Sequence, residues 1–294
     1  MKLLLFGKGG QVGWELQRAL APLGELVALG TAEADFRDPQ SLPALVRAHR
    51  PDVIVNAAAH TAVDRAESEP ELASAINAVA PGVLAREAAA AGAWLVHYGT
   101  DYVFDGSGRA PRDEDAPTGP LGVYGRTKLE GEQEIRASGC RHLILRTSWV
   151  YGARGGNFVK TMLRLAAERD SLSVVDDQVG APTGAELLAD ITAHCLRTLS
   201  ARPELGGTYH AVASGETSWH GYACHVIEWA RAHGHPVKTP REAIRAVPSS
   251  AFPTPARRPH NSRLDTRRLQ SAFGLRLPHW QVGVDRLLAE VLGS

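Results

Sequence analysis

The first half of the chain alternates short apolar runs with amphipathic segments. Residues 2–6 are almost continuously apolar and end at glycines, as expected for a strand that is buried on both faces of a parallel sheet. From Val12 to Leu20 apolar side chains recur at helical spacing, and the segment stops before Pro22 and Gly24. The same alternation predicts strands at 25–29, 52–56, 94–98 and 142–146, and helices at 41–49, 70–91 and 124–137. This pattern favours an α/β fold with a doubly wound, Rossmann-like parallel sheet.

The alternation of predicted strands and helices becomes less regular after residue 150. Turn-rich stretches such as 253–259 appear, and apolar periodicity returns in three predicted helices at 158–167, 185–199 and 219–232. We therefore expect a dinucleotide-binding domain over residues 1–150. A smaller mixed α/β substrate lobe is expected over 151–294, with some of its segments returning to the first sheet.

Composition excludes several classes of partner and compartment. The 32 basic residues balance the 32 acidic ones, so the chain lacks the strongly basic field that nucleic acids or anionic membranes attract. The amino-terminal apolar run is too short for a signal peptide, and no run approaches the ~18 residues of a membrane span. The three cysteines lie far apart without zinc-binding spacing. We expect a cytoplasmic protein with buried, inert thiols.

A glycine turn joins the first predicted strand to the first predicted helix. Gly7, Gly10 and Gly13 allow a tight turn and close approach of a pyrophosphate to the backbone, at a helix end rich in free N–H groups. A plain tight turn would also use glycines, but this position within a strand-turn-helix unit favours a dinucleotide site. At the end of the second strand stand Gly30 and Thr31, neither an acidic residue nor an arginine. The choice between NADPH and NADH therefore stays open.

Two further strand ends and one helix carry candidate catalytic groups. Tyr124 and Lys128 lie four residues apart on one face of a predicted helix, where a lysine cation would favour the phenolate and ease proton transfer. Thr100 follows the strand at 94–98, and small residues follow Asn56. Because ligands bind at the carboxyl edge of such sheets, these groups should converge there. The histidines His60, His97 and His210 are interpreted as structural or wall residues.

With these motifs, nearly the whole sequence resembles the extended short-chain dehydrogenase/reductases. The glycine turn and the Tyr-x-x-x-Lys pair are typical of the superfamily, and further motifs are similar to its rhamnose-pathway branch. These are Asn-Ala-Ala-Ala-His-Thr-Ala-Val-Asp at 56–64, Thr-Asp-Tyr-Val-Phe at 100–104, Arg-Thr-Ser-Trp-Val-Tyr at 146–151, Gly-Ala-Pro-Thr at 180–183 and Arg-Pro-His-Asn-Ser at 258–262.

The resemblance implies reduction of the C4 keto group of dTDP-4-dehydro-β-L-rhamnose to dTDP-L-rhamnose, with hydride from NADPH or NADH. It implies that Tyr124 protonates the nascent alkoxide, Lys128 binds the nicotinamide ribose and lowers the tyrosine pKa, and Thr100 orients the carbonyl. The expected cofactor-binding residues are Gly7, Gly10, Gln11, Val12, Asp35, Phe36, Ala57, Ala58, Ala59, Thr61, Tyr98, Tyr124 and Lys128. The expected substrate-binding residues are Val63, Thr100, Asp101, Tyr102, Trp149 and Arg258.

Two weaker expectations concern a metal ion and subunit association. Glu186 and Asp190 lie four residues apart on a predicted helix, and with Glu15 of the first helix they could hold a hydrated Mg²⁺. An ordinary acidic helix face is the more frequent reason for such spacing. Some relatives resemble Mg²⁺-assisted enzymes at a subunit contact, which implies a homodimer for this chain as well.

Two other functions share most of these motifs. Another nucleotide-sugar reductase, epimerase or dehydratase of the same fold would keep the glycine turn and the Tyr124–Lys128 pair. Dehydratases usually continue the loop threonine with Asp-Glu, whereas here Tyr102 follows Asp101. The second alternative is a non-catalytic NADP-binding regulatory subunit, similar to the one that associates with methionine adenosyltransferase. Retention of Thr100, Tyr124 and Lys128 favours an enzyme.

Overall fold

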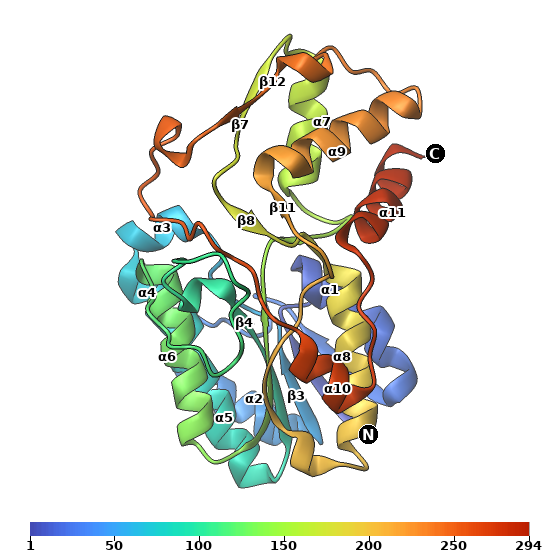
Figure 1. Ribbon diagram of the computed structural model, residues 1–294. Helices are drawn as coiled ribbons and strands as arrows, with labels where there is room; N and C mark the ends of the chain where they lie inside the picture. Colours follow the sequence, from blue (N-terminus) through green and yellow to red (C-terminus); the bar gives the residue numbers. More distant parts are fainter. Residues whose placement is uncertain (294) are drawn as a thin grey trace.

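A six-stranded parallel sheet forms the centre of the larger of two lobes in the computed structural model, which describes residues 1–293 (Figure 1). The strands lie in the order β10-β5-β4-β3-β1-β2. Their bounds are β1 Lys2–Phe6, β2 Glu25–Leu29, β3 Val53–Asn56, β4 Trp94–Thr100, β5 Arg141–Thr147 and β10 Gly207–His210. The chain runs from β1 outward to β2 and then crosses back to β3 on the other side of β1. This reversal of direction opens a crevice beyond the carboxyl ends of β1 and β3, where such sheets bind ligands.

Helices cover both faces of this sheet, which confirms the predicted doubly wound fold. One face carries α1 Gln11–Leu20, α8 Ala185–Leu199 and α10 Arg267–Phe273. The other carries α2 Leu42–His49, α5 Ala80–Ala91 and α6 Val123–Ala137. The helix predicted at 70–91 is one continuous segment made of α4 Pro70–Ser74, a π-helical turn Ala75–Val79 and α5, and the short α3 Val63–Ser68 precedes it.

Alternation of side chains across the strands explains why the apolar runs are continuous. Leu3 and Leu5 point to the face covered by α1 and α8, whereas Leu4 and Phe6 point to the face covered by α2 and α5. All four side chains are fully buried. A strand covered on both faces has no solvent side, so it needs no polar residues.

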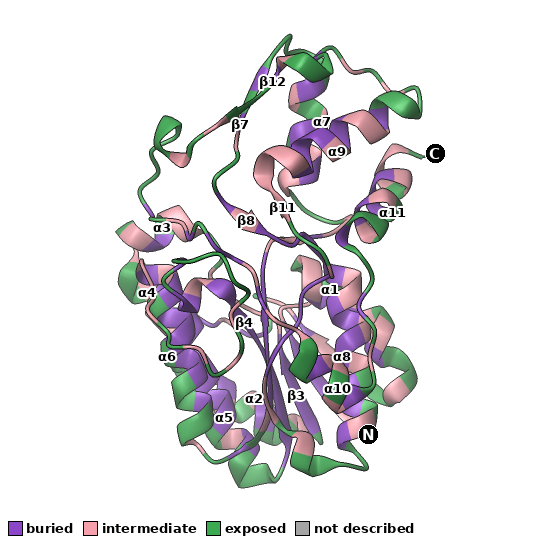
Figure 2. Ribbon diagram, viewed as in Figure 1, coloured by how far each residue is buried: buried purple, intermediate pink, exposed green. Residues whose placement is uncertain are grey.

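The smaller lobe has a core of its own (Figures 1 and 2). Its helices are α7 Phe158–Glu168, α9 Trp219–Ala232 and α11 Trp280–Leu292, and its parallel strand pair is β7 Leu172–Val175 with β12 Ile244–Val247. Four two-residue strands, β6 Val150–Tyr151, β8 Val179–Gly180, β9 Thr183–Gly184 and β11 Thr217–Ser218, lie where the lobes meet. The helices predicted at 158–167, 185–199 and 219–232 are α7, α8 and α9.

Several segments after residue 150 belong to the larger lobe. Strand β10 pairs with β5, α8 packs against α1, and α10 contributes to the same core. The chain therefore crosses between the lobes more than once, and these crossings fix the walls of the cleft between them.

The three cysteines have the environment that the sequence predicted. Cys140, Cys195 and Cys224 are buried and free, as predicted, and burial raises the pKa of each thiol. A raised pKa leaves little thiolate, so these thiols are poor nucleophiles. Within residues 1–293 no helix is both long and apolar enough to cross a membrane.

Candidate active site

The glycine turn is held against the end of β3. Gly7 has a φ of +86°, and a Cβ there would lie 2.7 Å from the carbonyl carbon of Ala57. A Cβ on Gly13 would collide with the carbonyl oxygen of Gly7. The N–H of Gly10 donates to that same oxygen at 3.0 Å. Only glycines fit this approach, which brings the first turn of α1 to the crevice between β1 and β3.

A cavity of about 370 Å³ lies at this crevice, and it gathers seven of the predicted cofactor residues. These are Gly7, Gly10, Asp35, Phe36, Ala57, Ala58 and Ala59. Arg37 also lines the cavity and donates to both carboxylate oxygens of Asp35, at 2.7 to 2.9 Å. Small side chains from the end of β3 leave room for a ligand close to the backbone. The turn and this cavity fit a dinucleotide.

Other predicted cofactor residues lie beside this cavity. Gln11 opens α1, and its Oε1 accepts from the amide of Asn157 in the smaller lobe at 3.3 Å. The side chain of Val12 packs against the core, so only its backbone faces the turn. Thr61 is exposed between β3 and α3. Tyr98 directs its phenol to Thr192 of α8, at 2.7 Å, and offers only its carbonyl oxygen to the site.

The predicted catalytic residues come together at the carboxyl end of β4. Thr100 is the last residue of β4, and Tyr124 and Lys128 lie in the first two turns of α6. The amine of Lys128 donates to the carbonyl oxygen of Tyr98 at 2.6 Å and lies 3.1 Å from Nε2 of His97. Thr100 and Lys128 are buried, and the amino terminus of α6 places Tyr124 beside Thr100. A hydroxyl, a phenol and an amine thus share one site.

Burial sets the protonation of the phenol. It raises the pKa of Tyr124, and the contact with the Thr100 hydroxyl acts in the opposite direction. The sequence led us to expect a lowered pKa from the lysine cation, but Lys128 is turned toward Tyr98 and His97 and burial dominates. Tyr124 therefore carries its proton at neutral pH, which the predicted role of proton donor requires.

Two more titratable groups in the site are perturbed by burial. Burial lowers the pKa of Lys128 to about 8. It raises the pKa of Asp101 to about 6, against hydrogen bonds from Ser262 and Thr100. The Thr100 hydroxyl donates to Asp101 at 3.1 Å, and Tyr102 packs edge-on against the ring of Tyr124, with centroids 5.3 Å apart. Such shifted groups in a cleft are typical of catalytic sites.

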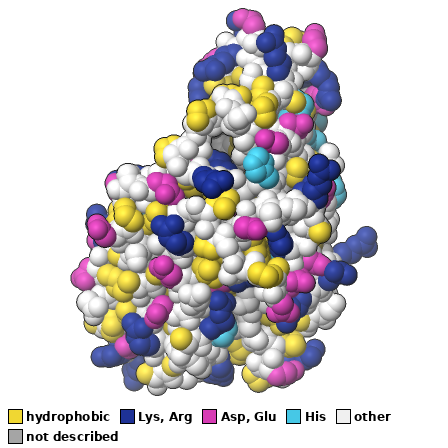
Figure 3. All heavy atoms as spheres, turned by 60° about the vertical axis from the view of Figure 1, so that its left-hand side comes forward, with side chains coloured by type: hydrophobic (Ala, Val, Ile, Leu, Met, Phe, Trp, Pro, Cys, Tyr) yellow, Lys and Arg dark blue, Asp and Glu magenta, His cyan; other side chains and the backbone are white. Residues whose placement is uncertain are grey.

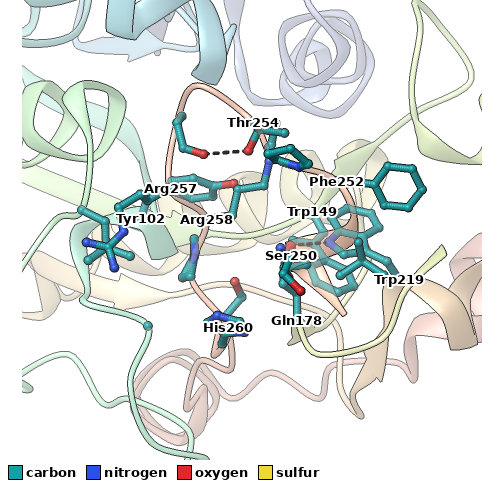
Figure 4. Close-up of a pocket in the computed structure, with 18 of the residues that line it drawn as sticks. Tyr102, Trp149, Gln178, Trp219, Ser250, Phe252, Thr254, Arg257, Arg258 and His260 are labelled. Carbon is teal, nitrogen blue, oxygen red and sulfur yellow. Dashed lines mark hydrogen bonds between the residues drawn. The ribbon is translucent and has the colours of Figure 1, made fainter. Parts of the chain in front are cut away.

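A larger cavity of about 1020 Å³ opens between the lobes (Figures 3 and 4). The indole of Trp149 stacks on that of Trp219, with centroids 3.7 Å apart. Trp149 has a φ of +50°, an uncommon conformation for a bulky residue that directs its ring into this stack. Tyr102 and Arg258 line the cavity on the side of the larger lobe. Three of the predicted substrate residues, Tyr102, Trp149 and Arg258, therefore line one space.

A strap over residues 248–260 connects β12 to the larger lobe (Figure 1). Arg258 forms an ion pair with Asp64 of α3, at 2.7 Å, and the N–H of Ala256 donates to the same carboxylate at 3.2 Å. Asp64 was not among the predicted site residues, although it ends the motif at 56–64. The neighbouring Val63 begins α3 and lies outside both cavities described above.

The carboxylates considered for a magnesium ion already have basic partners. Arg18 donates to Asp190 at 2.9 Å and to Glu15 at 3.4 Å, and Arg286 lies 3.5 Å from Glu186. A hydrated Mg²⁺ binds through free carboxylate oxygens, so this arrangement does not fit one. Residues 1–293 contain no group of three or more His, Cys, Asp or Glu side chains placed to hold a metal.

Comparison with known proteins places these features in one family. A family described as "RmlD substrate binding domain" matches residues 1–292. The dTDP-4-dehydrorhamnose reductase of Escherichia coli is 57% identical over 99% of this chain and 98% of its own length. The enzyme of the same name from Burkholderia thailandensis is 46% identical, with both chains fully covered.

Solved structures agree with this likeness. A dTDP-4-dehydrorhamnose reductase from Clostridium acetobutylicum superposes with a TM-score of 0.90 at 33% identity, and the match covers both chains completely. The enzyme from Bacillus anthracis, solved in complex with NADP, has a TM-score of 0.88 at 33% identity and covers 98% of this chain and 99% of its own. A UDP-glucose 4-epimerase from Thermus thermophilus, with a TM-score of 0.82 at 19% identity, shares the fold alone.

Proposed function

Because this chain belongs to the family of dTDP-4-dehydrorhamnose reductases, we propose that it reduces the C4 keto group of dTDP-4-dehydro-β-L-rhamnose to give dTDP-L-rhamnose. It is an NAD(P)H-dependent oxidoreductase of the dTDP-rhamnose pathway. The observation that carries the proposed chemistry is that contacts lead from Lys128 toward the smaller cavity and from Tyr124 to the larger one.

Tyr124 and Lys128 line neither cavity themselves but contact residues that lead to one or the other. Lys128 contacts His97, which contacts Asn56, and the residues that follow Asn56 line the smaller cavity. Tyr124 packs against Tyr102, which lines the larger cavity. A dinucleotide in the smaller cavity and a nucleotide sugar in the larger one would therefore meet at the phenol.

The chain supplies placement and a proton. When bound, the reduced nicotinamide supplies the hydride. When the substrate is bound, the Thr100 hydroxyl turns from Asp101 to donate to the keto oxygen, and the phenol of Tyr124 gives its proton to that oxygen as negative charge develops there. Lys128 in its ammonium form stabilises the phenolate that remains and holds ribose hydroxyls. Trp149 and Arg258 hold the nucleotide sugar, Arg258 through its diphosphate.

Either nicotinamide cofactor fits the proposal. Asp35 and Arg37 sit at the rim of the smaller cavity and neutralise each other. Arg37 can turn to a 2′-phosphate, whereas Asp35 can accept from a 2′-hydroxyl, so neither cofactor meets an unpaired like charge. The related Bacillus anthracis enzyme was solved with NADP. We infer that NADPH and NADH are both accepted.

The direct test follows NADPH oxidation by the purified protein. The keto sugar is generated in situ from dTDP-glucose with the upstream dehydratase and epimerase, and omission of either enzyme is the control. We expect absorbance to fall only when the complete system is present. Faster turnover of a GDP-linked or UDP-linked keto sugar would overturn the assignment of the substrate.

The alternative functions make different predictions in the same assay. An epimerase returns its bound cofactor to the same oxidation state at the end of each turnover, so it consumes no added NADPH. A regulatory subunit binds NADPH without turnover. The placement of Tyr124 beside the buried residues Thr100 and Lys128 supports the enzyme over the binding subunit.

The proposal also covers the compartment and the oligomeric state of the enzyme. We propose that it acts in the cytoplasm, where its three buried free thiols stay reduced. Association into a homodimer stays a prediction, and sedimentation velocity of the purified protein tests it.

A further inference from the structure

Two buried polar side chains stand behind the amine of Lys128. His97 lies at the centre of β4 with Nε2 3.1 Å from the Lys128 amine and Nδ1 3.1 Å from the amide nitrogen of Asn56. Asn56 ends β3, and its Oδ1 accepts from the N–H of Ala58 at 3.1 Å. His97 and Asn56 are each 1% exposed and Lys128 is 2% exposed. The three groups therefore satisfy one another without water.

The backbone fixes the direction of these hydrogen bonds. The N–H of Ala58 can only donate, so the atom of Asn56 that faces it must be the oxygen, and the amide NH₂ must face His97. Because that NH₂ can only donate, Nδ1 of His97 must accept and carries no proton. Burial lowers the pKa of His97 well below its ordinary value, so the ring is neutral and its one proton sits on Nε2.

The proton on Nε2 points at Lys128. An ammonium has three donors and no lone pair, so it cannot accept from Nε2–H, whereas a neutral amine can. The carbonyl oxygen of Tyr98, 2.6 Å away, accepts from the same amine in either state. The pair formed by Asn56 and His97 thus favours the neutral form of Lys128.

Of the other groups around Lys128, some favour its ammonium form and others do not. Glu132, one helical turn further along α6, favours the cation, but its carboxylate is held by Arg146 of β5 at 2.7 Å. Tyr124 of α6 is protonated, and the π-helical turn packed against α6 offers Asn77, which carries no charge. Asp101 lies beyond Thr100, to which it is hydrogen-bonded. Burial lowers the pKa of Lys128 to about 8 against the pull of Glu132, which agrees with the direction of the hydrogen bonds.

We propose that Asn56 and His97 are positioning residues that favour the neutral amine of Lys128 in the free enzyme at mildly alkaline pH, so that binding of the anionic dinucleotide there brings a proton from solvent onto its nitrogen. The phosphates and ribose hydroxyls of the dinucleotide favour the ammonium, which then stabilises the phenolate of Tyr124. This inference rests on the proposed cofactor site and reductase chemistry, and it assigns a function to two side chains that need not touch either ligand.

The tautomer of His97 is measurable in the free protein. Long-range ¹H–¹⁵N spectra of histidine-labelled protein distinguish the two neutral tautomers, and the signal of His97 is the one lost in His97→Gln. At about pH 9, where Lys128 is mostly neutral, we expect Nε2 to be protonated and Nδ1 free. In Asn56→Asp a carboxylate faces Nδ1, and we expect the tautomer to switch. An unmodified protein with Nδ1 protonated, or with an imidazolium at neutral pH, overturns the proposal whatever the enzyme reduces.

Proton uptake on cofactor binding is the second readout. Calorimetry of NADPH binding in two buffers of different ionisation enthalpy should give about half a proton taken up near pH 8, rising toward one at pH 9. The 2′-phosphate, with a second pKa of about 6, is already ionised there, and NADH should give the same uptake.

Two variants separate this proposal from a structural role of His97. In His97→Gln the amide oxygen can accept from the ammonium form of Lys128, so although burial still acts, uptake at pH 8 should fall clearly below that of the unmodified protein while NADPH still binds. His142→Gln changes a half-buried histidine of β5 that bonds to the carbonyl of Cys140, and it should leave uptake unchanged. Equal uptake in all three proteins overturns the proposal. Failure of the unmodified protein to bind NADPH would contradict the cofactor site, and the spectra would still report the tautomer.

Discussion

Replacement of Gly7 by alanine tests how closely the glycine turn approaches the end of β3. Gly7 has a φ of +86°, and an added Cβ would lie 2.7 Å from the carbonyl carbon of Ala57 and from the nitrogen of Ala58. Both contacts are with backbone, which cannot rotate away as a side chain can. Either the turn or the carboxyl end of β3 must therefore move.

Two terms add to the expected loss of stability. A left-handed backbone conformation costs an L-residue about 1–2 kcal/mol relative to its usual conformations. Inserting a methyl group into a fully packed site costs about 1–3 kcal/mol more. We therefore expect Gly7→Ala to lower the free energy of unfolding by about 2–5 kcal/mol. Because Gly7 also lines the smaller cavity, the displacement should weaken NADPH binding as well.

Gly92→Ala is a matched control for the backbone term. Gly92 ends α5 with a φ of +64°, and its added Cβ would have no atom within 4 Å. This variant should lose only about 1–2 kcal/mol and keep its NADPH affinity. Urea unfolding and fluorescence titration with NADPH measure both quantities. Equal losses in the two variants would refute the claim that contact with β3, rather than backbone strain, makes Gly7 necessary.

Three further substitutions test the site and its support. Tyr124→Phe should bind NADPH normally and lose roughly 10²- to 10⁴-fold in kcat, since it removes only the hydroxyl that we propose as the proton donor; unchanged turnover contradicts that role. Burial raises the pKa of Asp101 to about 6, so the folded state holds its proton more tightly than the unfolded state and loses stability as the pH rises from about 4 to 6. Asp101→Asn should remove this pH dependence and be more stable than the unmodified protein by roughly 2–3 kcal/mol at pH 7, measured by urea unfolding; a parallel pH dependence in both proteins would count against it. Glu132→Gln leaves the buried Arg146 without its charged partner and should cost about 3–5 kcal/mol, whereas Glu134→Gln on the exposed face of α6 should cost less than ~1 kcal/mol. Similar costs for the two glutamates would show that burial does not govern the pair.

The strands at the centre of the sheet were predictable because each is a nearly continuous run of apolar residues, as a strand buried on both faces requires. Strand β10 was not, since Gly207–His210 contains only one large apolar residue and lies at the edge of the sheet. Its pairing with β5 depends on a connection of many residues from the smaller lobe. The short helix α10 likewise buries Leu269 and Phe273 against the larger lobe, a contact that local periodicity does not reveal.

The candidate site, like the fold, has residues that local sequence patterns predict and residues that they do not. Gly7, Tyr124 and Lys128 could be named as candidates from the sequence because each belongs to a local spacing with a physical reason. Asp64 and the function proposed for His97 were not found, because they depend on partners far away in the sequence. The one signal was a histidine in the middle of an otherwise apolar strand, which requires a polar partner once it is buried. That partner could only be identified once β3, β4 and α6 were in place.

Transfer of deuteride tests the central claim most directly. The purified protein is given NADPH deuterated at C4 of the nicotinamide, in separate reactions for each face, together with dTDP-4-dehydro-β-L-rhamnose. The product is then analysed by NMR. We predict dTDP-L-rhamnose with deuterium at C4 of the sugar, from one face of the nicotinamide only. Product without deuterium at C4, or no product while NADPH remains bound, would contradict the assignment as a reductase of this keto sugar.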